Sequence, residues 1–219
     1  MDWSPGEVFD VVRLTLLVSG IALAISAALG VPVGALLGLR QFRGRGLARA
    51  VIYTGMGLPP VVVGLAIYLL LSRRGPLGDL GWLFTPSGMM LAQVVIAFPI
   101  VAGLTSAALE ALDPELGLQI SSLGATTRQQ ARALLVQARG GVVAALLAAF
   151  GGIISEVGAA MLVGGNIEGR TRVLSTAIVL ETRRGEFGMA LALGGVLLLL
   201  AFVVNAGLLR LQATPRHPP

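Results

Sequence analysis

Five long apolar runs decide what this chain can fold into. They occupy residues 14–39, 51–71, 89–109, 142–163 and 187–209. A helix needs about 20 mostly apolar residues to cross the hydrocarbon core of a bilayer, and each run is long enough. None of them has the polar residues at every third or fourth position that give a surface helix its solvated face. The runs therefore predict an all-α membrane protein, a polytopic bundle of about five transmembrane helices.

The composition supports a membrane protein and excludes several other classes. Apolar residues make up 55% of the 219 residues and charged residues only 12%, whereas a soluble domain has about 25% charged residues. Intrinsic disorder is excluded for the same reason, because it requires low hydrophobicity and high charge. The chain has no cysteine, and its single histidine, His217, lies in a proline-rich tail. We therefore expect no metal site and no catalytic residue.

The placement of the basic residues predicts the orientation of the chain. All 16 are arginines, and four of them, at positions 40, 43, 45 and 49, lie in the short turn between the first two runs. Basic residues concentrate in short cytoplasmic loops, so we expect the N-terminus outside and, after five spans, the C-terminus inside. The formal net charge of +5 would suggest nucleic acid in a soluble protein. Here it is interpreted as a topology signal, and no nucleic-acid partner is expected.

Polar, proline and glycine positions in or beside the spans mark a candidate translocation path or gate. Glu156 is the one acidic residue well inside a run, and a charge in lipid costs at least about 2.5 kcal/mol, so it should face protein or water. Both a structural role and a pathway role remain open for it. Gln93 is expected chiefly to form an interhelical hydrogen bond. The candidate path or gate residues are Pro59, Pro60, Gln93, Ser155, Glu156, Gly158 and Asn166.

Glycines recur every four residues along the first run, at Gly30, Gly34 and Gly38. Small residues at this spacing share one helix face and allow two helix backbones to approach closely. Packing within the bundle is the preferred interpretation of this face, and a dedicated dimer face is the alternative.

The polar segment of residues 110–141 is long for a simple connector. We expect two short helices around Gly124, the first beginning at Asp113-Pro114, with Arg128 facing water or the acidic groups of a partner. The chain contains no phosphate-binding loop of the Walker type, so ATP chemistry by that route would have to come from another protein. The segment therefore predicts a docking element for a soluble partner.

This polar segment resembles the EAA loop of ABC importer permeases. In that family a Glu-Ala-Ala start is followed by a glycine and, ten residues later, by an apolar residue; Gly124 and Leu134 have this spacing. Two positions depart from the family pattern, since Leu118-Gln119-Ile120 replaces Glu-Ala-Ala and Gln137 replaces the usual proline.

Three further stretches resemble the oxyanion group of the same family. Residues 57–65 are similar to its second-span region, and residues 154–167 to its Glu-x-Gly-Ala and Gly-Asn signature. Residues 181–187 are most similar to the tungstate branch. Together the resemblance covers nearly the whole chain.

The resemblance implies an ABC type I importer permease fold in the plasma (bacterial inner) membrane, with one permease domain over residues 1–219 and a cytoplasmic coupling loop at about 110–141. The implied partners are a second permease copy in a homodimer, a cytoplasmic ABC ATPase, an extracytoplasmic oxyanion-binding protein and membrane lipid. ATP and Mg would be bound by the ATPase, so no cofactor is expected on this chain. The implied substrate is an oxyanion, with tungstate first and molybdate or sulfate next. The residues implied in ATPase coupling are Ser121, Ser122, Leu123, Gly124, Ala125, Thr126 and Arg128.

The residues alone leave other functions open. A proton-coupled secondary anion transporter could use Glu156, although no inverted repeat is visible in the spans. An intramembrane enzyme would need paired acids or a Ser/His pair, and the spans contain neither. A membrane scaffold without transport activity is a further alternative. ATP dependence of transport and co-purification with an ATPase would separate these functions from an importer permease.

Overall fold

A computed structural model describes residues 3–210 of the chain. Within this range the chain forms ten α-helices and one short 3₁₀ turn at Gly78–Leu80, and no β-strand. The prediction of an all-α protein is confirmed, while His217 lies outside the described residues. In chain order the α-helices are α1 (Pro5–Leu39), α2 (Arg45–Met56), α3 (Pro60–Leu71), α4 (Pro86–Glu110), α5 (Pro114–Ser122), α6 (Thr127–Gln137), α7 (Arg139–Ile154), α8 (Gly158–Gly164), α9 (Leu174–Arg184) and α10 (Phe187–Arg210).

Three helices, α1, α4 and α10, are each long and apolar enough to cross a bilayer alone. They cover the first, third and fifth predicted runs. Helix α1 begins earlier than its apolar run because Ser4 and Glu7 form a capping box: the Glu7 amide donates to Ser4 Oγ (3.2 Å) and the Ser4 amide to the Glu7 carboxylate (2.7 Å). This box satisfies amides that the first helical turn leaves free, so the polar N-terminal turns continue the helix.

The second and fourth runs are broken, and the expectation of one continuous helix in each is wrong. Helices α2 and α3 meet at an angle of 102°, because Pro59 and Pro60 lack the amide hydrogen that would continue α2. The fourth run is divided between α7 and α8 by residues 155–157, and α6 meets α7 at 68°. The described residues thus hold three candidate spans, or up to five when each bent pair counts as one.

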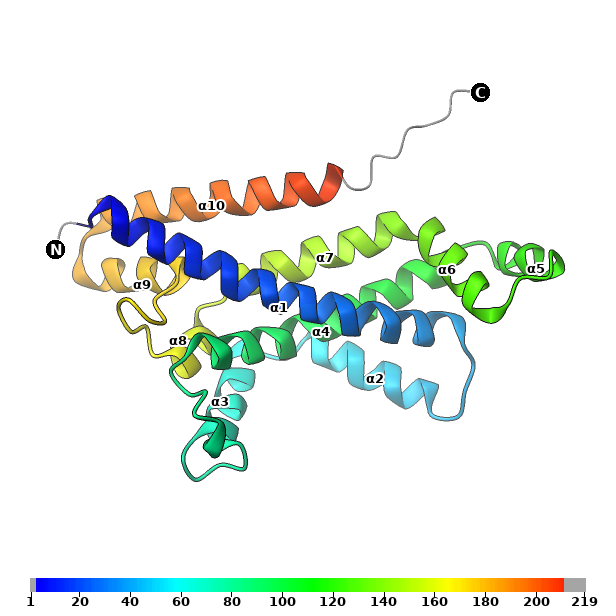
Figure 1. Cartoon of the computed structure of the whole chain (residues 1–219), viewed down its shortest axis with the longest axis horizontal. Coiled ribbons are helices and arrows are strands. Elements are labelled where there is room, and N and C mark those ends of the chain that lie inside the picture. Colours follow the sequence, from blue (N-terminus) through cyan, green and yellow to red (C-terminus); the bar gives the residue numbers. More distant parts are fainter. Residues whose placement is uncertain (1–2, 211–219) are drawn as a thin grey trace.

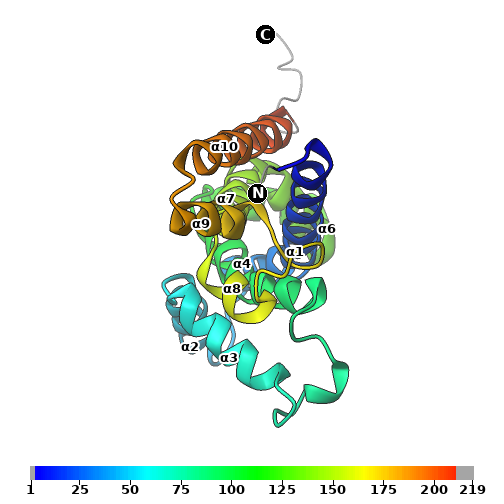
Figure 2. The ribbon, with the colours of Figure 1, turned by 90° about the vertical axis from the view of Figure 1, so that its left-hand side faces the viewer.

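Helices α1, α4 and α7 lie together in the middle of the bundle, with α10 on one side and α2 and α3 on the other (Figure 2). The glycine face of α1 lies against α4. A Cβ added to Gly30 would come within 2.9 Å of Val101 Cβ, and one added to Gly34 within 2.5 Å of the Ala102 carbonyl oxygen. The face therefore packs inside the same chain, as the bundle-packing interpretation predicts.

The polar segment of residues 110–141 and the segment that contains α9 lie toward opposite ends of the long axis (Figure 1). Helices α5 and α6 form one end, and α9 lies beside the start of α1 at the other. The face of α9 that carries Leu174 and Ala177 is buried. This arrangement puts the predicted coupling loop and the α8–α9 segment at opposite ends of the bundle.

Candidate functional site

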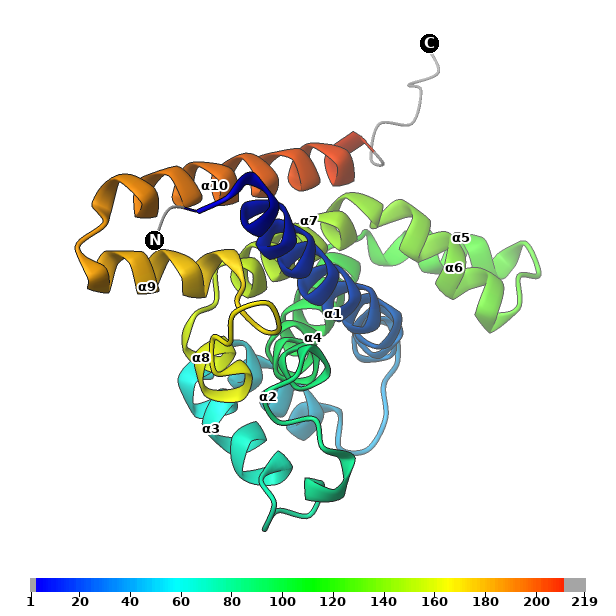
Figure 3. The same cartoon turned by 60° about the vertical axis from the view of Figure 1, so that its left-hand side comes forward.

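The predicted coupling loop is a compact pair of helices that projects from the bundle (Figure 3). Asp113 caps α5 by accepting the amide of Glu115 at 2.9 Å. Thr126 caps α6 in a capping box with Gln129, whose carboxamide oxygen accepts the Thr126 amide at 2.7 Å. Between the helices Gly124 has φ +79°, a left-handed conformation that favours glycine. The prediction of two short helices around Gly124 is confirmed.

Apolar side chains attach this helix pair to the bundle. Leu134 and Ala138 are buried, and they cluster with Ala35 of α1 and Leu109 of α4. Gln130, which was not among the predicted residues, ties the two helices together by donating from Nε2 to the Gly117 carbonyl (2.9 Å) and to Ser121 Oγ (3.1 Å). The apolar residue ten positions after Gly124 is therefore the one that holds α6 on α1 and α4.

The turn between α5 and α6 is the exposed part of the loop. Leu123 is 87% exposed, and a large apolar side chain in a polar loop marks a protein contact surface when others lie near it. Leu118 on α5 is also exposed, at 71%. The hydroxyls of Ser121 and Ser122 bond back to carbonyls of α5, at 2.9 and 2.8 Å. Of the seven predicted coupling residues, Ala125 is half-buried and the other six are exposed.

Glu156 lies in the break between α7 and α8. Its Oε1 accepts the amide of Ala159 at 2.9 Å, so the carboxylate caps the start of α8. Its own carbonyl accepts a hydrogen bond from Ser175 Oγ of α9 at 3.0 Å. The preceding residue, Ser155, is exposed, and its hydroxyl donates to the Gly151 carbonyl at 2.7 Å. Glu156 thus joins three helices at a half-buried position.

The start of α3 approaches the same break. Pro59 precedes α3 and Pro60 is its first residue. A Cβ added to Gly158 would overlap Val61 Cγ2, and one added to Gly64 would come within 2.6 Å of Ala159 Cα. The backbones of α3 and α8 are therefore in close contact. The two broken spans meet at this point, so the prolines, Glu156 and Gly158 occupy one region of the molecule.

Of the other two predicted path residues, Gln93 lies beside the α7–α8 break, because it contacts the same Ile153 carbonyl that accepts the Glu156 amide at 3.3 Å, and Asn166 lies apart from it. Gln93 is 5% exposed, and its Nε2 donates to the Ile153 carbonyl at 3.1 Å. The expected interhelical hydrogen bond of Gln93 is confirmed, between α4 and α7. Asn166 lies beyond the other end of α8 with φ +51°, and its buried Oδ1 has no hydrogen-bond partner in residues 3–210.

The sequence did not predict one hydrogen-bonded contact between α1 and α9. Thr15 is 2% exposed; its Oγ1 donates to the Val11 carbonyl (2.7 Å) and accepts the amide of Leu174 (2.9 Å). The signal in the sequence was a hydroxyl side chain within an apolar run, which also contains Ser19 and Ser26. Such a residue is usually hydrogen-bonded when buried, but the sequence does not name its partner.

The N-terminal end of α1 borders a cavity of about 500 Å³ with charged walls. Arg13 and Arg170 line it and have no ion pair among the described residues, whereas Arg172 pairs with Glu168 at 3.3 Å. Three acidic residues also line the cavity: Glu7, Asp10 and Glu168. The walls carry both charges, which suits contact with another protein surface better than concentration of an anion. Residues 3–210 contain no group of His, Asp and Glu side chains that could hold a metal ion.

The chain is similar to known transport proteins over nearly its whole length. A family model for the binding-protein-dependent transport system inner membrane component matches residues 30–215. A probable anion ABC transporter permease protein of Haloferax volcanii is 43% identical, covering 90% of this chain and 87% of that protein. The tungstate uptake system permease protein TupB of Peptoclostridium acidaminophilum is 39% identical, covering 94% and 90%. A chain of the MetNI methionine ABC transporter has the same fold, with a TM-score of 0.76 at 19% identity over 97% of this chain and 100% of that chain.

Proposed function

The chain belongs to the family of binding-protein-dependent transport system inner membrane components, and from this premise we propose that it imports an oxyanion, with tungstate as the first candidate. It is a multi-pass permease subunit of an ABC transporter in the inner membrane and not an enzyme. In the proposed complex two copies of the chain form the translocation path, and a separate ATPase supplies the energy.

The choice of tungstate rests on one observation, the 39% identity to a tungstate uptake permease over 94% of this chain. Residues 181–187, which resemble the tungstate branch, form the end of α9, the turn after it and the first residue of α10. There the Glu181 carboxylate is buried and pairs with Arg184 at 2.9 Å. Molybdate and sulfate are the next candidates, because a separate binding protein would deliver the substrate.

The proposed coupling element is the α5–α6 pair at residues 110–141. Support for it comes from the exposure of Leu123 and from the burial of Leu134 between α1 and α4. An ATPase that contacts the exposed turn would move α6. The buried Leu134 and Ala138 would then transmit that motion to α1 and α4, the two helices they pack against. The cavity at the N-terminal end of α1, with its mixed charges, is the proposed contact region for the binding protein.

Uptake assays decide the substrate. The complex with its ATPase is reconstituted in vesicles with the binding protein, and uptake of tungstate is measured against excess molybdate or sulfate. We expect ATP-dependent uptake of tungstate that molybdate competes for more strongly than sulfate does. Uptake driven by a pH gradient without ATP would instead favour a proton-coupled transporter, and the absence of any ATP-dependent uptake would contradict the proposed function.

A matched pair of glycine variants tests the coupling element. Gly124 and Gly44 both have positive φ, +79° and +89°, and a Cβ on either would meet nothing within 4 Å. Leucine at either position costs roughly 1–2 kcal/mol of backbone strain, so both variants should melt at similarly lowered temperatures. Gly124→Leu alone should lower the anion transported per ATP, with the complex still assembled. Equal transport ratios for the two variants would refute the role of the turn.

A further inference from the structure

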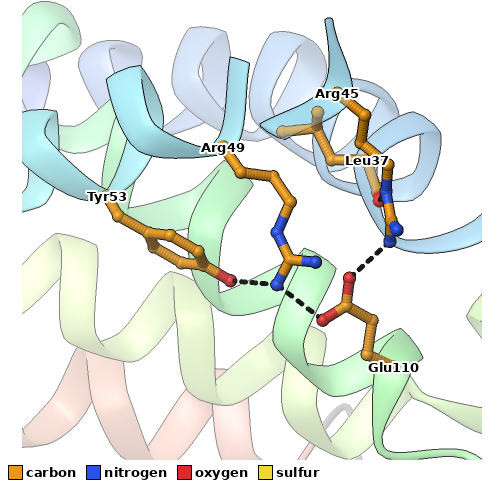
Figure 4. A network of polar contacts seen from close by, with 5 residues as sticks. All are labelled: Leu37, Arg45, Arg49, Tyr53 and Glu110. Atoms are coloured by element: carbon orange, nitrogen blue, oxygen red, sulfur yellow. Dashed lines mark hydrogen bonds and ion pairs between the residues drawn. The ribbon is translucent and has the colours of Figure 1, made fainter. Parts of the chain in front are cut away.

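Three helix ends meet in one ion-pair network just before α5 begins. Glu110 is the last residue of α4, and each oxygen of its carboxylate has its own arginine on α2 (Figure 4). The Arg45 guanidinium lies 2.7 Å from Oε1, and that of Arg49 lies 2.8 Å from Oε2. Two ion pairs thus hold the end of α4 to the first two turns of α2.

Further contacts fix both arginines. Arg45 Nε donates to the Leu37 carbonyl at 2.7 Å, one of the carbonyls that the last turn of α1 leaves without an intrahelical partner. Arg49 donates to the Tyr53 hydroxyl at 3.3 Å, and its guanidinium carbon lies 5.6 Å from the centre of the Tyr53 ring. The network therefore connects α1, α2 and α4.

The three charged side chains are partly shielded from solvent. Their exposed fractions are 16% for Arg45, 30% for Arg49 and 28% for Glu110. Exposed single ion pairs contribute little, whereas a carboxylate shared by two oriented guanidinium groups forms a network of charge-assisted hydrogen bonds. We therefore treat the network of Arg45, Arg49 and Glu110 as a connection between helices with a preferred geometry, and not as a chance surface contact.

Helix α2 is held to α4 at its other end as well. A Cβ on Gly55 would come within 2.9 Å of Pro99 Cβ, and one on Gly103 would overlap the Met56 sulfur. Helix α2 therefore contacts α4 at both of its ends. Residues 57–59 then make the 102° bend into α3, and α3 packs against α8 through Gly64 and Ala159.

We infer that Glu110 is a positioning residue, which transmits movement of the coupling loop through α2 to the α3–α8 contact. Only residues 111–113 separate Glu110 from α5, so a shift of α5 pulls directly on this network. Because α2 contacts α4 at both of its ends, the displacement reaches the bend at Pro59 and then the start of α8. This inference rests on the proposed function, since it requires a partner that moves the loop.

The experiment combines a stability measurement with a transport measurement. The variants are Glu110→Gln, Arg49→Gln and the double variant, and Asp79→Asn is the control. Asp79 is an exposed acid of the short 3₁₀ turn, outside the coupling element, and its carboxylate forms no ion pair in the described part of the chain. Arg49→Gln leaves the Arg45 pair in place, so one informative variant remains if Glu110→Gln does not fold.

Melting temperatures of the purified protein test the network without any partner. If the network stabilises the protein, the melting temperature of the double variant should fall by less than the sum of the two single decreases, and Asp79→Asn should melt like the wild type. Strictly additive decreases in melting temperature would overturn the inference, whatever the transport data show.

Transport in vesicles, with the complete complex, tests the positioning role. We expect Glu110→Gln to bind the ATPase and hydrolyse ATP within about twofold of the wild type. The tungstate moved per ATP should fall at least about fivefold, the lower end of typical couplings between sites, while Asp79→Asn keeps the wild-type ratio. An unchanged ratio for Glu110→Gln would overturn the role. If the wild-type complex itself moves no anion with ATP, the proposed function fails, and non-additive melting temperatures then show a purely structural network.

Discussion

Replacing Gly34 with alanine should force apart α1 and α4, the two longest helices of the bundle. The added Cβ would lie 2.5 Å from the Ala102 carbonyl oxygen and 2.7 Å from Thr105 Cβ. Non-bonded carbon atoms are relaxed at about 3.5–4.0 Å, so the helices would have to separate by about 1 Å. A backbone carbonyl within a helix cannot rotate out of the way, so the strain cannot be relieved by a side-chain movement.

Two opposing contributions set the change in the free energy of unfolding for Gly34→Ala. Overpacking of a well-packed interior costs about 1–3 kcal/mol, and the better helix propensity of alanine returns up to about 1 kcal/mol. The expected net loss is up to about 2 kcal/mol. For a chain of this length 1 kcal/mol corresponds to about 2–4 °C in melting temperature, so Gly34→Ala should melt as much as roughly 8 °C below the wild type.

Gly20→Ala is the matched control, because a Cβ at this position of the same helix meets nothing within 4 Å. It should melt at or above the wild-type temperature, since only the propensity term acts on it. Both proteins are heated in detergent at one scan rate, because membrane proteins often unfold irreversibly. The remaining monodisperse fraction is read by size-exclusion chromatography. If the two variants melt together, the close contact of α1 with α4 is refuted.

Three further predictions concern single side chains. Thr15→Val should lower the free energy of unfolding by about 1–3 kcal/mol, because it leaves the buried Leu174 amide without its acceptor; Thr15→Ser, which keeps the hydroxyl, should melt near the wild type. Leu123→Asp should leave the melting temperature unchanged, because the side chain is 87% exposed, yet abolish co-purification with the ATPase; retained binding would remove Leu123 from the interface. Glu156→Gln keeps an oxygen that can accept the Ala159 amide and should retain ATP-driven uptake. Glu156→Leu removes the cap and should lower the free energy of unfolding by about 0.5–2 kcal/mol. Loss of uptake in the glutamine variant would favour a titrating role for the carboxyl group.

The apolar runs predicted the spans well, because a helix in lipid must satisfy its own backbone and so needs a continuous apolar length. They could not show the bends, since apolar residues continue on both sides of Pro59 and Pro60. The proline pair carried the only signal of the 102° turn. In the same way the sequence placed Gly124 between two helices, because glycine and capping residues act locally.

Contacts between distant residues could not be predicted in the same manner. Arg45 and Glu110 are 65 residues apart, and the sequence supplied only their charges and the expected side of the membrane. The Thr15 hydroxyl and the Leu174 amide are 159 residues apart, and an amide gives no side-chain signal at all. A single sequence does not identify such pairs of residues. They become visible only in the fold that brings them together.

Glu156 shows how the fold unites two roles that the sequence set against each other. An acidic residue is unexpected beside an anion path, since a fixed negative charge would repel the substrate. Its carboxylate, however, accepts the Ala159 amide at 2.9 Å, and the N-terminal amides of a helix partly compensate a negative charge. The same bond defines where α8 begins, and α8 is the helix that α3 contacts through Gly64. A movement of α3 that displaced α8 would therefore alter this cap, so the structural role observed for Glu156 is compatible with the gate role that we predict for it.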